Sequence, residues 1–204
     1  MPFHQLIDLC QIYLLIFTLP KLKYLKIISH QFKDPVPLPF ATDNQQLSMI
    51  EHLIIDYSIT FSELAAILSY IPKVYHLNFW HRDINYPLIQ MISTIALSKL
   101  THTSMNISFL EFDEFEIFLS KLPSTLKSFN LVYTEKELEY LDFDMSEQLI
   151  LQNFPQLEKF YFNYTVYTYD EDEFIFDGCV CDQFISSFWI NRQLLLNLRS
   201  FLFL

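Results

Sequence analysis

The stretch "LPKLKYLKII", Leu19 to Ile28, decides how this sequence is interpreted. A proline comes first, and apolar residues then follow three and two positions apart, with lysines between them. Strand side chains alternate between two faces, so we expect Leu25 and Ile27 on one face and Tyr24 and Lys26 on the other. The stretch therefore predicts a short strand with one buried side and one side that faces solvent.

The same pattern returns along the chain, and its recurrence predicts repeats. Apolar residues spaced by three and two occur at Leu22/Leu25/Ile27, Ile50/Leu53/Ile55, Val74/Leu77/Phe79, Ile107/Leu110/Phe112, Leu126/Phe129/Leu131 and Leu157/Phe160/Phe162. Their starts are 28, 24, 33, 19 and 31 residues apart, which is near the range of leucine-rich repeats. Chance matches are common in a chain rich in Leu and Phe, but six in order, four of them after a proline, favour true repeats.

Three helices are expected between these strands. Thr60, Asp113 and Asp144 each precede a Glu by three positions, which is the spacing of a capping box at a helix start. The helices are "SELAAILSY", "EFEIFLSK" and "SEQLILQN", and each is followed by a proline that cannot continue it, namely Pro72, Pro123 or Pro155. The ninth repeat position usually holds Asn or Cys; Ser58, Thr134 and Thr165 suit it here, but Phe115 does not.

These elements predict an α/β fold of the leucine-rich-repeat solenoid type, with six or seven irregular repeats. A curved parallel sheet is expected on the concave side and helices on the convex side. We expect a single domain over 1–204, with repeats from about 12 to 167, an acidic loop at 168–181, and a C-terminal helix and possible last strand at 182–204. Leu198, Phe201 and Phe203 fit that strand, which leaves an apolar end and predicts self-association or a continuation.

Composition and charge limit the classes of function. The chain has 204 residues, 24 acidic and 13 basic side chains, and a formal net charge of −11. Nucleic-acid binding depends largely on Lys and Arg at phosphates, so we expect no nucleic-acid partner. There is one glycine, Gly178, whereas glycine-rich loops for phosphates or nucleophiles need several. Nucleotide-dependent chemistry of the common kinds is therefore not expected.

Cysteine usage and hydropathy indicate the compartment. Cys10, Cys179 and Cys181 are too few and too unevenly placed for a disulfide framework or a four-ligand zinc site, and indicate reduced thiols. The apolar run near the N-terminus has no preceding basic residue and no cleavage site, and it is too short to span a bilayer. We therefore expect a cytoplasmic or nuclear protein with no membrane partner.

The sequence predicts no catalytic site, cofactor or metal. His52 and His76 fall on equivalent outward positions, but a metal needs a further nearby ligand. The acidic run 170–173 lacks the alternating ligands and central glycine of a calcium loop. Asp142 and Asp144 imitate a glycosidase pair, although Asp144 is the expected helix cap. Without a nucleophile, a base and an orienting group together, we expect a non-enzyme.

The outward positions of the strands are the expected binding surface. Positions three, five and seven of each repeat project onto the concave face, where solenoids commonly bind. Tyr and Trp are frequent interface anchors. The predicted partner-binding residues are His52, His76, Asn78, Trp80, Phe109 and Tyr161. The alternative interpretation is a general compositional bias, since 21 Phe and 12 Tyr make any face look adhesive.

Several stretches resemble the leucine-rich-repeat portion of F-box proteins, in a divergent group expanded in some invertebrates. They are "IFTLPKLKYLKI", "SMIEHLIIDYSITFSELAAILSYIPKVYHL", "LTHTSMNISFLEFDEFEIFLSKLPSTLKSF", "FPQLEKFYFNY" and "QFISSFWINRQ". The similarity covers about Ile12 to Gln193, and the last stretch is the most distinctive. In that group an N-terminal F-box docks on the Skp-type adaptor of a cullin ubiquitin ligase, while the repeats select the substrate.

The resemblance implies a protein–protein recognition module that corresponds to the substrate-binding repeats of a ubiquitin-ligase receptor. The thirteen residues before "LLIFTLP" are too few for an F-box, and the ending "LLLNLRSFLFL" differs from the family pattern. We therefore do not expect this chain to bind the adaptor. The alternative is a free-standing interaction scaffold or truncated family member without ligase recruitment. In both cases the partner is an unknown protein.

Overall fold

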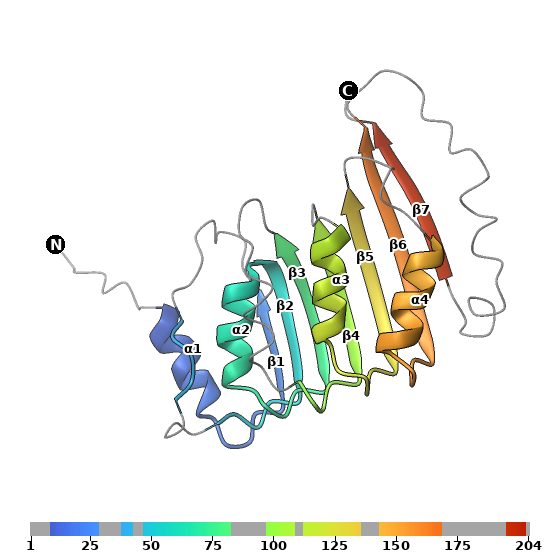
Figure 1. Cartoon of the computed structure of the whole chain (residues 1–204). Coiled ribbons are helices and arrows are strands. Elements are labelled where there is room, and N and C mark those ends of the chain that lie inside the picture. Colours follow the sequence, from blue (N-terminus) through green and yellow to red (C-terminus); the bar gives the residue numbers. More distant parts are fainter. Residues whose placement is uncertain are drawn as a thin grey trace.

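The computed structural model describes residues 9–28, 38–42, 47–82, 97–108, 112–135, 143–168 and 195–202. The strands are β1 Tyr24–Ile28, β2 His52–Ile59, β3 His76–Arg82, β4 His102–Ser108, β5 Ser128–Glu135, β6 Lys159–Thr168 and β7 Leu195–Leu202 (Figure 1). The helices are α1 Leu9–Phe17, α2 Phe61–Ser69, α3 Phe112–Lys121 and α4 Phe143–Asn153.

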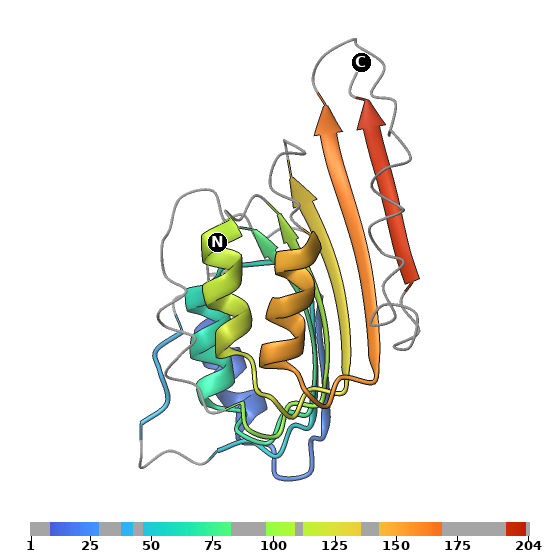
Figure 2. The same cartoon turned by 45° about the vertical axis from the view of Figure 1, so that its right-hand side comes forward.

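All seven strands form one sheet, and their order across it is their order along the chain. Every neighbouring pair is parallel. The four helices lie on the same side of this sheet (Figure 2). No described helix covers the other side, which we call the open face. The expected α/β arrangement with a parallel sheet is therefore confirmed.

The turn before each strand repeats one set of hydrogen bonds. The Lys23 carbonyl oxygen accepts the backbone N–H groups of Glu51 and His52, at 2.8 and 3.0 Å. The same pair of bonds recurs at the carbonyls of Glu51, Tyr75, Thr101 and Lys127. Equivalent residues are therefore Lys23, Glu51, Tyr75, Thr101, Lys127 and Glu158, at intervals of 28, 24, 26, 26 and 31 residues. These intervals are more even than those of the apolar pattern.

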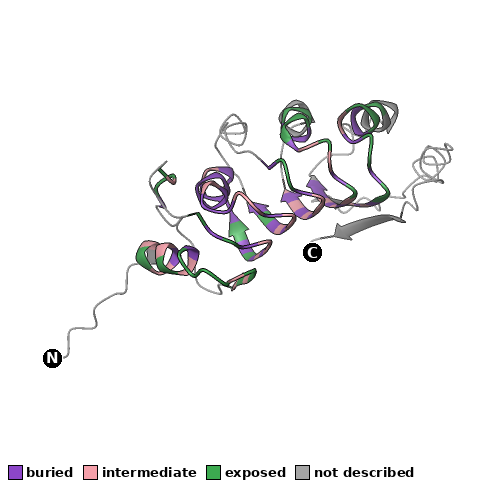
Figure 3. Ribbon diagram, turned by 90° about the horizontal axis from the view of Figure 1, so that it is seen from below, coloured by how far each residue is buried: buried purple, intermediate pink, exposed green. Residues whose placement is uncertain are grey.

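The core lies between the sheet and the helices. In Figure 3 buried residues alternate with intermediate or exposed ones along the strands, as expected when one face of the sheet packs against the helices. The second apolar residues of the six predicted triplets were expected to stack in one core ladder, and five of them do: Leu53, Leu77, Phe129 and Phe160 are buried in one hydrophobic cluster, and Leu25, on the edge strand, packs against it half-buried. Strand pairing sets Leu25 beside Leu53 and Phe129 beside Phe160. Aromatic contacts extend the ladder, with the Phe129 and Phe160 ring centroids 5.3 Å apart.

The predicted fourth repeat, Ile107/Leu110/Phe112, is wrong. In β4 the ladder residue is Thr103, which pairs with Leu77 on one side and Phe129 on the other. The Thr103 hydroxyl donates to the Leu77 carbonyl oxygen at 3.2 Å, which satisfies a buried polar group. The repeat therefore starts at Leu100, seven residues earlier than predicted.

The predicted members of the fourth repeat take other places. Ile107 is buried further along β4, Leu110 lies outside the described residues, and Phe112 begins α3. When the fourth repeat starts at Leu100, its ninth position is Ser108 and not Phe115. Ser108 pairs with Thr134 on β5, so the corrected residue matches its neighbour in type.

The three predicted helices are present, and two of them begin before their predicted capping residues. The side-chain oxygen of Thr60 accepts from the Glu63 N–H at 3.2 Å, and a Glu63 carboxylate oxygen accepts from the Thr60 N–H at 3.1 Å, which confirms the capping box of α2. Helices α3 and α4 each begin one residue before the aspartate predicted to cap them, so Asp113 and Asp144 lie inside the first turn. All three predicted helices end before their prolines, as expected.

A seventh strand is present, but its register differs from the predicted one. Phe162 pairs with Leu196, and Tyr164 pairs with Leu198. The predicted frame required Leu198 to start the repeat and Phe201 to align with Phe160, whereas Phe201 pairs with Tyr167. The predicted acidic loop and C-terminal helix fall on 169–194, outside the described residues.

Candidate protein-binding face

Parallel pairing places equivalent residues of neighbouring strands side by side, so the open face carries rows of side chains that cross the strands. The first row is Tyr24, His52, His76, His102, Ser128 and Lys159. The second row is Lys26, Ile54, Asn78, Ser104, Asn130 and Tyr161. The third row is Trp80, Asn106, Val132 and Asn163.

The third row begins at β3 because the pairing of β2 with β3 is irregular. Ile54 pairs with Asn78, but the next aligned pair is Ser58 with Trp80. Strand β2 therefore carries two extra residues at this point. One of them, Asp56, is exposed on the open face.

Three stacked histidines form the centre of the first row, and we call them the histidine ladder: His52, His76 and His102. The ring centroids of His52 and His76 are 4.8 Å apart with an interplanar angle of 19°. Those of His76 and His102 are 4.1 Å apart at 13°. Because neighbouring strands are about 4.8 Å apart, residues in register on adjacent strands stack their rings face to face. The ladder is thus a direct product of register and residue type.

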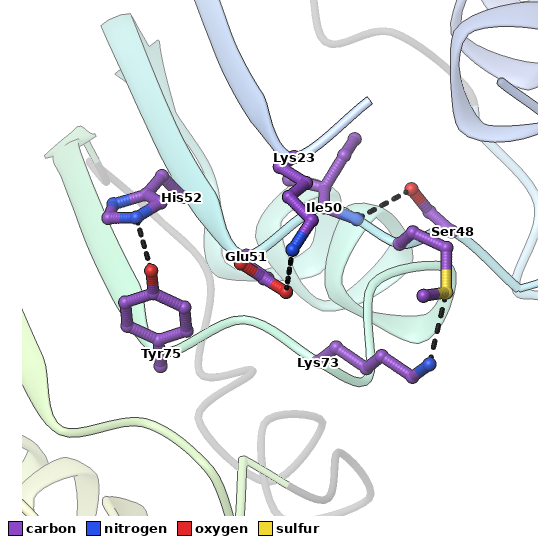
Figure 4. Close-up of polar contacts among 8 residues, drawn as sticks. Lys23, Ser48, Ile50, Glu51, His52, Lys73 and Tyr75 are labelled. Carbon is purple, nitrogen blue, oxygen red and sulfur yellow. Dashed lines mark hydrogen bonds and ion pairs between the residues drawn. The ribbon is translucent and has the colours of Figure 1, made fainter. Parts of the chain in front are cut away.

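Residues in the turns hold the two outer histidines. The Tyr75 hydroxyl is hydrogen-bonded to His52 Nε2 (Figure 4). The Thr101 hydroxyl lies 2.9 Å from His102 Nδ1. The central histidine differs, because its Nδ1 is buried and has no hydrogen-bond partner among the described residues. Nδ1 of His76 is therefore a buried nitrogen to which the described residues supply no hydrogen bond.

The pKa of the His76 imidazole is lowered from its ordinary value. Burial is the largest cause, because it disfavours the charged form, and repulsion from His102 and then His52 adds to it. All three causes act in the same direction. His76 is therefore neutral at pH 7 in the free protein.

A shallow hollow of about 330 Å³ lies over the first two rows. It extends from Tyr24 on β1 to Tyr161 on β6, and the three histidines of the ladder line it. Asn78, Ser104, Ser128 and Asn130 supply the remaining polar lining on the open face. No aspartate or glutamate is among the lining residues that the structure describes.

Amide side chains continue the polar surface beyond the histidines. Asn130 Nδ2 donates to Ser104 Oγ at 3.0 Å, which orders the second row. In the third row, Oδ1 of Asn106 and Oδ1 of Asn163 are buried and have no hydrogen-bond partner among the described residues. Unused acceptors of this kind are uncommon in folded proteins and need an explanation. Trp80 ends this row with half of its surface exposed, at 50%.

The structure brings four of the six predicted binding residues to the hollow: His52, His76, Asn78 and Tyr161. Trp80 lies in the next row on the same face, as its exposure requires. Phe109 lies outside the described residues.

Three open-face residues were missed by the apolar pattern, namely His102, Ser104 and Asn106. The signal that identifies them is the stretch "LSKLTH" from Leu97, which matches "LPKLKY" from Leu19 with serine in place of proline. In both stretches the final leucine donates its N–H to the carbonyl of the first leucine, Leu100 to Leu97 and Leu22 to Leu19. The turn sequence is therefore a better guide to the frame than the apolar core.

Charged residues lie around the hollow in pairs. Lys26 and Asp56 form an ion pair at 2.9 Å, and Lys23 and Glu51 form one at 3.1 Å. Such exposed pairs contribute little to stability. Lys159, at the end of the first row, is exposed. The ion pairs leave the hollow itself without a nearby unpaired carboxylate among the described residues.

The histidine ladder is not arranged as a metal centre. Nitrogen lone pairs lie in the ring planes, so stacked rings do not direct them toward one ion. Among the described residues, no group of three or more His, Cys, Asp or Glu side chains is placed to hold a metal. In the same part of the chain, no helix is long and apolar enough to cross a membrane.

Comparison with known proteins adds no relative: no protein family, curated protein or solved structure matches this chain.

Proposed function

We propose that this chain is a leucine-rich-repeat domain that recognises another protein through its open face. The sequential order of parallel strands supports the repeat assignment, as do the turn carbonyls that recur every 24 to 31 residues. In such folds each unit packs on its neighbours, and an extended surface is left for binding. Recognition, rather than catalysis, is the function that such a surface serves best.

One observation carries this proposal: the open face presents large apolar and aromatic side chains that the core does not use. Trp80 is 50% exposed, Tyr24 54% and Ile28 53%, and all three lie on strands of the same sheet. Tyr and Trp are enriched among the residues that dominate binding energy at protein interfaces. Asn78 and Asn130, which are half-buried on the same face, suit a role in hydrogen-bond selectivity.

The resemblance to F-box proteins suggests what the binding serves. By that resemblance the repeats correspond to the substrate-binding region of a ubiquitin-ligase receptor, and the partner is a protein selected for ubiquitination. A free-standing interaction scaffold is the alternative. The two differ in one measurable property, which is binding of a Skp-type adaptor in the context of the full protein. We expect the 204-residue chain alone not to form a stoichiometric complex with such an adaptor.

The test of the recognition surface is quantitative affinity capture with matched variants. Tagged wild-type chain, Trp80→Ala and Ile117→Ala are expressed in the same cells and their bound proteins are compared. Ile117 is a suitable control because it is 46% exposed on α3, on the helix side of the sheet. A true partner is depleted by Trp80→Ala and retained by Ile117→Ala.

The affinity of that partner is then measured with purified proteins. We expect Trp80→Ala to weaken it by about 2 kcal/mol, as truncation of an interface anchor usually does. Partners that depend on Ile117 and not on Trp80 would place the binding surface on the helices and contradict the proposal.

A further inference from the structure

We propose that the hollow over the histidine ladder binds an acidic peptide segment of the partner, and that this binding strengthens as the pH falls below 7. This inference rests on the proposed function, because it names the chemistry of the partner at the same face. It is carried by the lining of the hollow, which has three histidines and no described carboxylate, and by the stacking of the three rings.

The hollow differs in charge from the rest of the molecule. The chain has a formal net charge of −11, yet the hollow is lined by three histidines and by no described carboxylate. Lys159 stands at the β6 end of the first row, and Lys26 stands at the β1 end of the second, paired with Asp56. A negatively charged segment is therefore repelled less by this region than by the rest of the chain.

The three ladder histidines differ in their hydrogen bonds to the turns. His52 and His102 each engage one ring nitrogen with a turn residue, Tyr75 or Thr101. Nδ1 of His76 is buried and has no hydrogen-bond partner among the described residues, so a ligand in the hollow does not reach that nitrogen. A carboxylate is a pure acceptor when ionised, so it pairs best with imidazole rings that carry a proton on the exposed nitrogen.

Stacking of the three rings disfavours protonation of His76 as long as no anion is bound. Three rings 4.1 and 4.8 Å apart repel one another when charged, and this repulsion and burial both lower the pKa of His76. A bound carboxylate offsets the repulsion and raises that pKa. By linkage, a ligand that raises the pKa of a histidine binds more tightly as the pH falls through the histidine titration range.

The other titratable and charged groups around the ladder do not reverse this sign. On the neighbouring strands and turns they are Tyr24, Lys26 with Asp56, Tyr75, Tyr161 and Lys159. Asp56 is paired with Lys26, and Lys159 favours an anion. Among the described residues, His102 and then His52 are the charged neighbours that lower the pKa of His76.

The shape of the hollow favours a peptide over a compact ligand. It crosses from β1 to β6, which is roughly 24 Å at the usual spacing of strands. An extended peptide of about seven residues has this length. Tyr24 and Tyr161 at the two ends, and Ile54 between them, give apolar contacts to its non-acidic side chains.

The test uses a defined probe, a fluorescent octapeptide in which glutamate alternates with alanine. Its dissociation constant for the full chain is measured by anisotropy at pH 7.5 and 6.0, beside a peptide with glutamine in place of each glutamate. Glutamate stays ionised over this range. We expect the glutamate peptide to bind at least about fivefold more tightly at pH 6.0, and the glutamine peptide to show no such change.

Two variants separate the ladder from general charge. His76→Gln combined with His102→Gln removes the pH dependence, whereas Lys121→Gln, at the end of α3 on the helix side, removes a cation and leaves binding unchanged. Imidazole resonances of the unsubstituted chain give a second readout that needs no variant: addition of the glutamate peptide raises the pKa of His76. Equal binding of the two peptides, no binding at pH 6.0, or a His76 pKa that does not rise would each overturn the inference.

The two proposals fail in different ways. If a partner depends on Trp80 but the glutamate peptide does not bind, the face recognises proteins and the acidic chemistry is wrong. If the glutamate peptide binds through the ladder while no partner depends on Trp80, the acidic site stands and the proposed recognition surface is wrong.

Discussion

The two faces of the sheet are built from alternating residues of the same strands, yet their side chains have different surroundings. On β5, Phe129 is fully buried and contacts the rings of Phe154 and Phe160, whereas Asn130, one residue later, is half-buried and bonds to Ser104. On the face toward the helices, the hydroxyl of buried Thr103 donates to the Leu77 carbonyl oxygen. The open face leaves a tryptophan half exposed and histidine and asparagine atoms without partners. We therefore expect single substitutions to separate stability from the proposed recognition.

The largest difference is expected for the adjacent pair on β5. Phe129→Ala should lower the free energy of unfolding by about 3–5 kcal/mol, because it removes a fully buried ring and leaves a cavity. Asn130→Ala should lower it by no more than about 1 kcal/mol, since it loses one partly exposed hydrogen bond. Urea denaturation followed by circular dichroism measures both. Equal losses in the free energy of unfolding would show that stability does not depend more on the face toward the helices than on the open face.

Strand β3 offers the same contrast with a larger open-face side chain. Trp80→Ala should change the free energy of unfolding by less than about 1 kcal/mol, because half of the ring is already in solvent. Its neighbour Phe79 is buried, and Phe79→Ala should cost about 3–5 kcal/mol. Thermal melts of both variants are compared with binding of the Trp80-dependent partner. A large loss of melting temperature in Trp80→Ala with unchanged binding would assign the tryptophan to the core.

The one polar member of the core ladder gives a smaller effect. Thr103→Val keeps the shape of the side chain and removes the hydroxyl that donates to the Leu77 carbonyl. We expect the free energy of unfolding to fall by about 1 kcal/mol, the usual net value of one hydrogen bond. A gain in stability measured by urea denaturation would show that the buried hydroxyl is retained for a reason other than stability.

The smallest effect concerns the pH dependence of stability. The pKa of His76 is lower in the folded chain than its ordinary value, so the unfolded chain binds more protons at this residue. The contribution of a neutral His76 to the free energy of unfolding is therefore fully present above its pKa in the unfolded chain, about 6.5. This contribution is lost as the pH falls toward the pKa of His76 in the folded chain. The melting temperature should fall between pH 7.5 and 5.5, and it should fall less in His76→Gln. An equal fall in both proteins would remove His76 from the account.

The sequence predicted most of the fold because two independent signals agree in most repeats. Apolar spacing placed β1, β2, β3, β5 and β6, and the prolines and the Thr60 box placed the ends of the helices. In the fourth repeat the signals disagree: the ladder residue is a threonine, and a serine replaces the proline before it. A search for apolar residues therefore misses the repeat that starts at Leu100, and it places the start at Ile107, seven residues further along the chain.

The candidate site was predicted only in part, and for the same reason. His52, His76, Asn78 and Tyr161 belong to repeats whose frame was right, and they line the hollow. His102 belongs to the repeat whose frame was wrong, so the third member of the ladder was missed. Ring stacking and the unpaired Nδ1 of His76 depend on the register between strands, which the sequence of one strand does not contain.

The recurring turn carbonyls make the order of unfolding depend on position in the sheet. Each of them accepts both N–H groups from the next repeat alone, so a strand at an edge can detach without disturbing the strands beyond its neighbour. Amide hydrogens of β1, a short strand with half-buried and exposed residues, should exchange with solvent sooner than those of β4 in the middle. A bound peptide segment that crosses several strands connects repeats that otherwise unfold one at a time, and it therefore slows the unfolding of each repeat.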